Sequence, residues 1–208
     1  TDLKMKKICL VFTMLMIAVL VNAQDFISYK GSGKVILNDG TAFEGTVEYS
    51  LTSPGSVSIK VGDGKWEKYK AKEVKEFYLD LKHYVVLKPK GEISVGSDLA
   101  FGYIITAEDA RIKIYKNETQ SPVMTGGVAP VETTYYASLP GVEGEVYPLA
   151  GMQLNPSSKL SKYFEDCPAL AERIAKKEKG FSYGMITTDE IRLAMIEKYN
   201  TEYASCGK

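Results

Sequence analysis

The sequence predicts an α+β protein in which mainly antiparallel β-structure is followed by a C-terminal α-helical hairpin. Apolar and polar residues alternate through a series of short runs up to residue 149, as they do in half-buried strands. Clusters of Gly, Pro, Asn and Asp separate these runs and favour tight turns between antiparallel strands. From residue 155 the apolar spacing changes to about 3.6 residues, which is typical of amphipathic helices.

Residues 1–23 have the features of a secretory signal peptide, which includes a short N-terminal extension at 1–4. Two lysines precede an apolar run over residues 8–21, and Val21 and Ala23 supply the side chains expected at positions −3 and −1 of a cleavage site. A buried core helix is the alternative, but the lysine start and the Ala-Gln exit favour a signal peptide. The sequence therefore predicts an exported protein, in the periplasm or at the cell surface, with no transmembrane span after cleavage.

The rest of the chain divides into three regions. Residues 24–81 predict a small β-barrel-like domain, and residues 82–150 predict further antiparallel strands with a long loop at 117–131. Residues 151–208 predict the helical hairpin. Because the loop is longer than most connections inside compact domains, we expect it to be mobile or functional.

The first region carries the clearest strand and turn signals. Asn38, Asp39 and Gly40 join two alternating runs, and these residue types favour the backbone angles of a tight hairpin turn. A Gly-Ser-Gly segment at 31–33 predicts a bend before the hairpin. Five short strands with one helical turn near 71–74 predict an SH3-like or Sm-like barrel, which closes to remove its edges.

Three aromatic residues, Trp66, Tyr135 and Tyr136, are the candidate ligand-binding residues. Aromatic rings offer flat apolar surfaces on which ligands and partners stack. Trp66 is either such a stacking ring or a core or rim residue of the barrel. The two tyrosines either form a contact surface with the 117–131 loop or pack against the C-terminal helices.

The first predicted helix opens at Asn155 and Pro156. Asn is a favoured helix cap, and Pro is favoured at the first helical position. Pro168 interrupts the apolar stripe that follows, so we expect a kink or break there, with Asp166 or Cys167 capping the second piece.

The second predicted helix opens with a capping box formed by Thr187 and Glu190. Its expected apolar face consists of Ile191, Ala194, Met195 and Tyr199. Two helices joined by a short loop pack antiparallel, which brings the end of the chain back toward Cys167. A disulfide between Cys167 and Cys206 is therefore expected, with two free thiols or an intermolecular bond from Cys206 as the alternatives.

The charge balance argues against nucleic acid as a partner. The chain has 26 basic and 26 acidic residues, and residues 1–23 contain three lysines and one aspartate. The remaining chain therefore has a formal net charge of −2. Without a basic excess there is no strong attraction to phosphates.

The sequence contains no catalytic constellation. The single histidine, His83, lies in an apolar strand, where a packing role is favoured. The Cys-x-x-Cys spacing of zinc sites and the Gly-x-Ser-x-Gly nucleophile motif do not occur. Glu143 and Glu145 are a conceivable hydrolase pair, but nothing distinguishes them from other surface carboxylates. We therefore expect no catalytic residues, no cofactor and no metal.

A set of short motifs runs along the chain after the Ala23-Gln24 exit: residues 35–40 with Gly45, 69–77, 112–115, 135–136 and 163–170. Their order resembles that of a loosely defined group of uncharacterised exported proteins from Bacteroidota. The resemblance covers most of residues 24–200 and implies export from a Gram-negative cell, but it carries over no functional residues.

These observations favour a non-enzymatic exported protein that acts through binding or assembly. Its expected partner is a protein or another component of the cell envelope. The first alternative is a glycan or small-molecule binding module that uses exposed aromatic rings in one concave site. The second is a carboxylate-dependent hydrolase, which requires two acidic side chains facing each other in a cleft.

Overall fold

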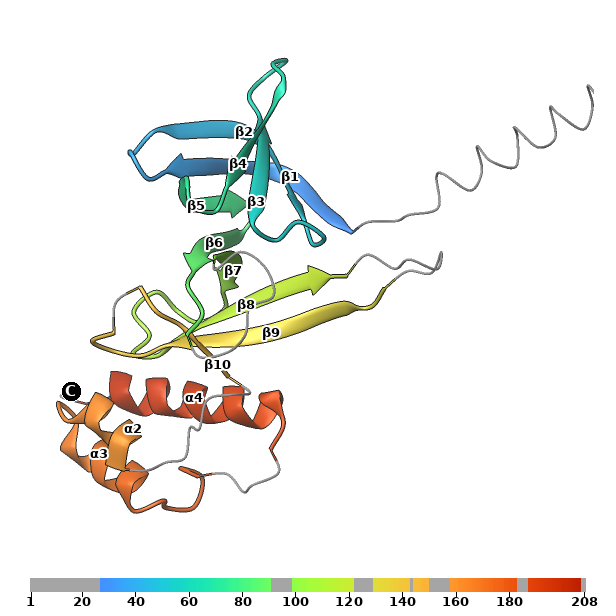
Figure 1. Ribbon diagram of the computed structural model, residues 1–208. Helices are drawn as coiled ribbons and strands as arrows, with labels where there is room; N and C mark the ends of the chain where they lie inside the picture. The colour runs from blue at the N-terminus through green and yellow to red at the C-terminus, as the bar shows by residue number, and fades with distance from the viewer. Residues whose placement is uncertain are drawn as a thin grey trace, which may run out of the picture.

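A ten-stranded antiparallel sheet with helices against one end forms the protein in the computed structural model, which describes residues 27–90, 99–121, 129–142, 144–149, 158–182 and 187–206. Figure 1 shows strands β1 to β5 at one end, the long β8–β9 hairpin across the middle, and the helices beyond it. The strand order is β10-β9-β8-β7-β6-β5-β1-β2-β3-β4. The α+β prediction is confirmed at this level. The predicted signal peptide, residues 1–23, lies outside the described residues.

The strands are β1 (Ser28–Leu37), β2 (Ala42–Ser50), β3 (Ser56–Lys60), β4 (Trp66–Lys70), β5 (Val74–Leu79), β6 (Lys82–Leu87), β7 (Ala100–Ile104), β8 (Lys113–Gln120), β9 (Val131–Ser138) and β10 (Tyr147–Pro148). The helical segments are α2 (Ser158–Ser161), the 3-10 helix η1 (Lys162–Phe164), α3 (Pro168–Ala175) and α4 (Asp189–Ala204). Part of the predicted 117–131 loop is therefore strand, since β8 extends to Gln120.

The sheet is open, so the predicted SH3-like or Sm-like barrel is not supported. β1 pairs with both β2 and β5, and β2, β3 and β4 follow in order, but β4 and β5 do not pair. The turn at 71–73 keeps them apart. In this turn Ala71 is buried in the core, and its N–H donates to the carbonyl of Gly55 at 2.9 Å instead of pairing with β5.

The predicted hairpin at 38–40 is confirmed. Gly40 has a φ of 88°, and its N–H donates to the Leu37 carbonyl at 3.1 Å. The Asp39 carboxylate accepts a hydrogen bond from the Thr41 N–H at 2.8 Å. The turn therefore has the local chemistry that favours a tight β-connection.

The predicted bend at 31–33 is wrong, because β1 continues straight through this segment. Gly33 is required by the close approach of strand β5, whereas Gly31 lies against a side chain of the turn that follows β5. A β-carbon on Gly33 would lie 2.0 Å from the carbonyl oxygen of Tyr78, and one on Gly31 would lie 2.2 Å from a carboxylate oxygen of Asp80. Glycine thus permits close approach at the β1–β5 boundary.

Two large hydrophobic cores lie on the two halves of the sheet. The first is an aromatic cluster in which Phe77 stacks on Tyr84 at 4.4 Å between ring centroids and meets Phe101 edge-on at 5.0 Å. It includes residues on both sides of the predicted domain boundary at 81. The second lies between the C-terminal strands and the helices and includes Ile112, Ile114, Phe164, Ile174, Ile196 and Tyr199.

The break at Pro168 is confirmed, with Pro at the start of α3 and Cys167 at its N-cap position. At α4 the N-cap is Thr188 rather than Thr187, and its side chain makes no capping hydrogen bond. The predicted face of α4 is partly wrong. Met195 and Tyr199 are buried together with Ile196, but Ile191 is 49% exposed and Ala194 is also exposed.

The first predicted helix opening, Asn155 and Pro156, lies outside the described residues. Within the residues that the structure describes, no helix combines the length and the apolar character needed to cross a membrane.

Candidate functional site

A groove lies between α4 and the connection from β7 to β8. We call it the α4 groove; its volume is about 810 Å³. Its apolar wall consists of Ile105, Ile114, Leu193 and Ile196. Its polar groups come from Thr106, Asp109, Arg111, Glu197, Asn200 and Thr201. Ligand sites for small molecules have this size and this mixture of an apolar wall with a few polar groups.

The β7–β8 connection is held in place by short-range hydrogen bonds. The Ile105 N–H donates to the Ile114 carbonyl at 3.0 Å, which extends the strand pairing by one step beyond β7. The Thr106 hydroxyl accepts from the Ile114 N–H at 3.1 Å. One rim of the groove is therefore fixed to the sheet.

Asn200 fixes α4 to the same strand. Its amide nitrogen donates to the Ile112 carbonyl at 2.9 Å, and its amide oxygen accepts from the Ile112 N–H at 2.9 Å. A primary amide offers the same donor and acceptor as a peptide group. Asn200 therefore satisfies the backbone of Ile112 as a neighbouring strand would, and it sets the distance between the helix and the sheet.

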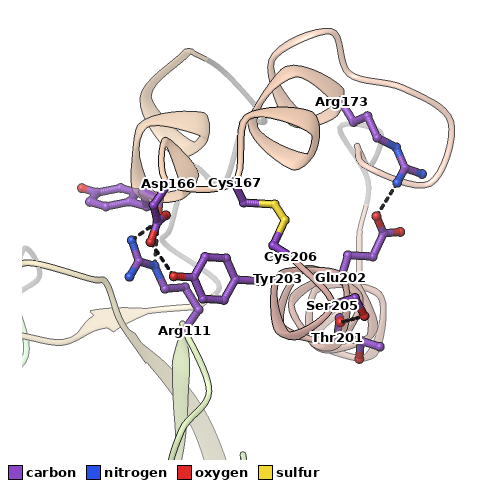
Figure 2. The surroundings of a disulfide bond; sticks show 10 residues. Arg111, Asp166, Cys167, Arg173, Thr201, Glu202, Tyr203, Ser205 and Cys206 are labelled. Atoms are coloured by element: carbon purple, nitrogen blue, oxygen red, sulfur yellow. Dashed lines mark hydrogen bonds and ion pairs between the residues drawn. A yellow bond between two sulfur atoms is a disulfide. The ribbon is translucent and has the colours of Figure 1, made fainter. Parts of the chain in front are cut away.

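Arg111 links the groove to the first helical segments (Figure 2). Its guanidinium donates to the Tyr163 carbonyl at 3.0 Å and to the Asp166 carboxylate at 3.1 Å, and it lies 4.8 Å from the ring centroid of Tyr203. The Tyr203 hydroxyl donates to the other oxygen of Asp166, and this hydrogen bond raises the pKa of Tyr203. The charge of Arg111 is thereby balanced at the edge of the groove.

A disulfide closes this end of the molecule. Cys167 and Cys206 are bonded, with Cα atoms 5.9 Å apart, which confirms the predicted intramolecular pair. Figure 2 shows this bond between the start of α3 and the end of α4, with Tyr203 beside it. Arg173 of α3 forms an ion pair with Glu202 of α4. Because Cys206 lines the groove, the cross-link also fixes the groove wall.

The three predicted ligand-binding residues lie in different places. Trp66 is on the outermost strand β4, is 41% exposed, and has the Lys30 ammonium 5.0 Å from its ring centroid. Tyr135 packs against the second core, whereas Tyr136 packs on the other face of β9 against Leu87, Tyr115 and Val146. Seven strands lie between β4 and β9, so the structure does not bring these rings into one site.

Other candidate residues have structural partners. His83 forms a 2.9 Å contact with the Glu76 carboxylate, and its ring stacks on Tyr78. Glu145 is paired with Lys90 at 2.7 Å, which lowers the pKa of Glu145, and Glu143 lies outside the described residues. Across the described ranges, no group of three His, Cys, Asp or Glu side chains is arranged to hold a metal ion.

No pattern in the sequence identifies the groove residues. Arg111, Asn200 and Tyr203 are polar or aromatic residues without a motif, and their partners are 37 to 88 positions away. The one available signal was Asn200, a poor helix former inside a predicted helix, which favours a side chain with a specific partner.

Comparisons of the chain with models of protein families, with curated proteins and with solved structures give no significant match.

Proposed function

We propose that this chain is an exported, non-enzymatic binding protein that holds a small amphipathic molecule in the α4 groove. The observation that carries this proposal is the groove itself, whose volume of about 810 Å³ suits a ligand of moderate size. The ligand's apolar body would contact Ile105 and Leu193, which are accessible apolar residues of the groove. Its polar end would lie toward Arg111 or Glu197.

The disulfide supports the location. Stable disulfides form in the periplasm, at the cell surface and outside the cell, whereas the cytosol keeps thiols reduced. A protein whose binding groove is closed by Cys206 would keep that groove in its cross-linked form in such a compartment. We therefore propose that it acts in the periplasm or at the cell surface.

The test uses anilinonaphthalene sulfonate, a dye with an apolar ring system and one anionic group. We expect saturable binding of one dye per chain, read from its fluorescence when the dye is excited directly. Ala204 lines the groove and Ala194 does not, yet both are exposed alanines of α4. Ala204→Trp should therefore abolish the binding, whereas Ala194→Trp should leave it unchanged.

Both variants must first show the thermal unfolding transition of the wild-type protein, since the dye also binds partly unfolded chains. Equal dye binding by the two variants, or no saturable binding by the wild type, would contradict the assignment of the groove. A dye that binds only in the groove can then be displaced by candidate lipids and peptidoglycan fragments, which identifies the ligand class.

A further inference from the structure

A second cluster of polar and aromatic side chains lies far from the α4 groove. Tyr29 of β1, Tyr103 of β7 and Glu118 of β8 form what we call the ammonium cage, and Lys82 of β6 occupies it. These residues are brought together because the sheet curls, so that the start of β1 meets β8. Two contacts hold the end of β8 there: the Ile27 N–H donates to the Gln120 side chain at 3.0 Å, and the Gln120 N–H donates to the carbonyl of Leu51, just after β2, at 2.9 Å.

Two tyrosine rings form the walls of the cage. The Lys82 ammonium lies 4.8 Å from the ring centroid of Tyr29 and 4.6 Å from that of Tyr103. Both distances are within the range in which the negative face of an aromatic ring attracts a cation. One ammonium group is therefore held between two aromatic faces.

A carboxylate completes the cage. Glu118 is largely buried, accepts a hydrogen bond from the Tyr29 hydroxyl at 3.0 Å, and pairs with the Lys116 ammonium at 2.6 Å. Lys116 also lies 5.8 Å from the Tyr103 ring centroid. These contacts hold the carboxylate and both rings in fixed positions, and the Lys82 charge adds to those that favour the ionised carboxylate.

The position of Lys82 in the chain allows its ammonium group to move out of the cage. It is the first residue of β6 and follows the turn at Asp80 and Leu81, whose leucine is fully exposed. Among the described residues no carboxylate lies within 4.0 Å of its ammonium, in contrast to Lys116. A flexible four-carbon stem therefore carries a cation that only ring faces and a more distant charge retain.

The geometry points to a binding site for an organic ammonium ion, formed by Tyr29, Tyr103 and Glu118 and occupied in the free protein by Lys82. An external ammonium ligand binds as Lys82 moves into solvent. Quaternary ammonium ions suit such a cage best, because they have no N–H groups to leave unsatisfied and aromatic rings recognise them well. This site is independent of the α4 groove, so either assignment can fail without the other.

The test measures choline binding from the upfield shift of its methyl proton signal, which aromatic rings cause on contact. If Lys82 fills the cage in about nine of ten molecules, it weakens the apparent affinity about tenfold. We therefore expect Lys82→Ala to bind choline about tenfold more tightly than the wild type. The matched control is Lys30→Ala, which removes a lysine from the single ring of Trp66 and should leave choline binding unchanged.

Two comparisons separate cage binding from non-specific contact. In the Lys82→Ala background, Tyr103→Phe should keep the binding and Tyr103→Leu should abolish it, since only the first retains an aromatic face. The neutral isostere 3,3-dimethylbutanol should not bind, because it has the shape of choline without the charge. Equal binding of the isostere, or no gain of affinity in Lys82→Ala, overturns the assignment. Lys82→Met keeps an apolar side chain without the charge and must also bind choline more tightly than the wild type. This variant controls for the packing that Lys82→Ala loses.

Discussion

The two halves of the sheet are stabilised in different ways. Around the first core, strands β1, β2 and β3 are consecutive in the chain and pair as hairpins, and the interior is filled by stacked aromatic rings. Around the second core, α4 has sixteen residues, but the other helices are short: α2 has four residues and α3 has eight. Helices as short as α2 and α3 are not stable alone. Their position depends on a disulfide, on ion pairs and on the bonds from Arg111 and Asn200.

This difference indicates that turn residues and neighbouring strands are enough to form hairpins, whereas short helices need contacts between residues that are distant in the sequence. Four measurements test this comparison of the two halves, beginning with the largest expected effect.

Loss of the disulfide should be the most damaging change to the second half. The bond joins residues 39 positions apart, and a loop of this size corresponds to about 3–4 kcal/mol in the chain-entropy treatment. Cys206→Ser should lower the free energy of urea unfolding by about this amount, and reduction of the wild type should give the same value. The reductant should have no effect on the variant. Unchanged stability of the reduced wild type would mean that the ion pairs alone hold the helices.

The first half should be most sensitive at Gly33. A methyl group on Gly33 meets the backbone of Tyr78, whereas one on Gly31 meets the Asp80 side chain, which can rotate away. Gly33→Ala should therefore cost about 2–3 kcal/mol of unfolding free energy, and Gly31→Ala less than about 1 kcal/mol. Similar losses in both variants would show that β1 and β5 do not approach as closely as described.

Buried tyrosines allow the two cores to be compared directly. The Tyr199 hydroxyl in the second core donates to the Phe181 carbonyl at 2.9 Å, but the buried hydroxyl of Tyr49 in the first core has no hydrogen-bond partner among the described residues. Tyr199→Phe should cost about 1 kcal/mol, whereas Tyr49→Phe should be neutral or stabilising. Thermal unfolding of the two variants gives the sign of each change, and a clear loss in Tyr49→Phe would contradict this description of the aromatic core.

The smallest effect concerns acid stability. Burial alone would raise the pKa of Glu118, but hydrogen bonds from Lys116 and Tyr29 and the lysine charges outweigh it, so that the pKa is lowered. The resulting stabilisation is present above the ordinary glutamate pKa of about 4.3 and is lost as the pH falls through the lowered value. Urea unfolding between pH 5 and about pH 3 should therefore show a flatter pH dependence for Glu118→Gln than for the wild type. Parallel curves would show that Glu118 is not held in this way.

The sequence predicted those features that depend on neighbouring residues. The turn at Asn38–Gly40 and the break at Pro168 follow from backbone preferences of a few residues, and the Cys167–Cys206 bond follows from antiparallel helices. Closure of the barrel could not be judged, because it depends on whether β4 meets β5 across the turn at 71–73.

Both proposed binding sites were missed for the same reason. In the ammonium cage, Tyr29 and Glu118 are 89 positions apart, and in the α4 groove Ile112 and Asn200 are 88 positions apart. No local period or motif relates such residues. The predicted aromatic residues were chosen by type alone, and type does not show whether a ring such as Tyr135 faces a core or a ligand.

The attachment of β1 to β8 has a consequence for the order of folding. The hydrogen bond between Ile27 and Gln120 spans 93 positions, so the start of β1 pairs with the end of β2 long before it can meet β8. Contacts at this separation require a large loop to close, which slows folding. During synthesis, the hairpins of the first half can form early. The contacts that join β1 to β8, including the hydrogen bond between Tyr29 and Glu118, are then among the last to form.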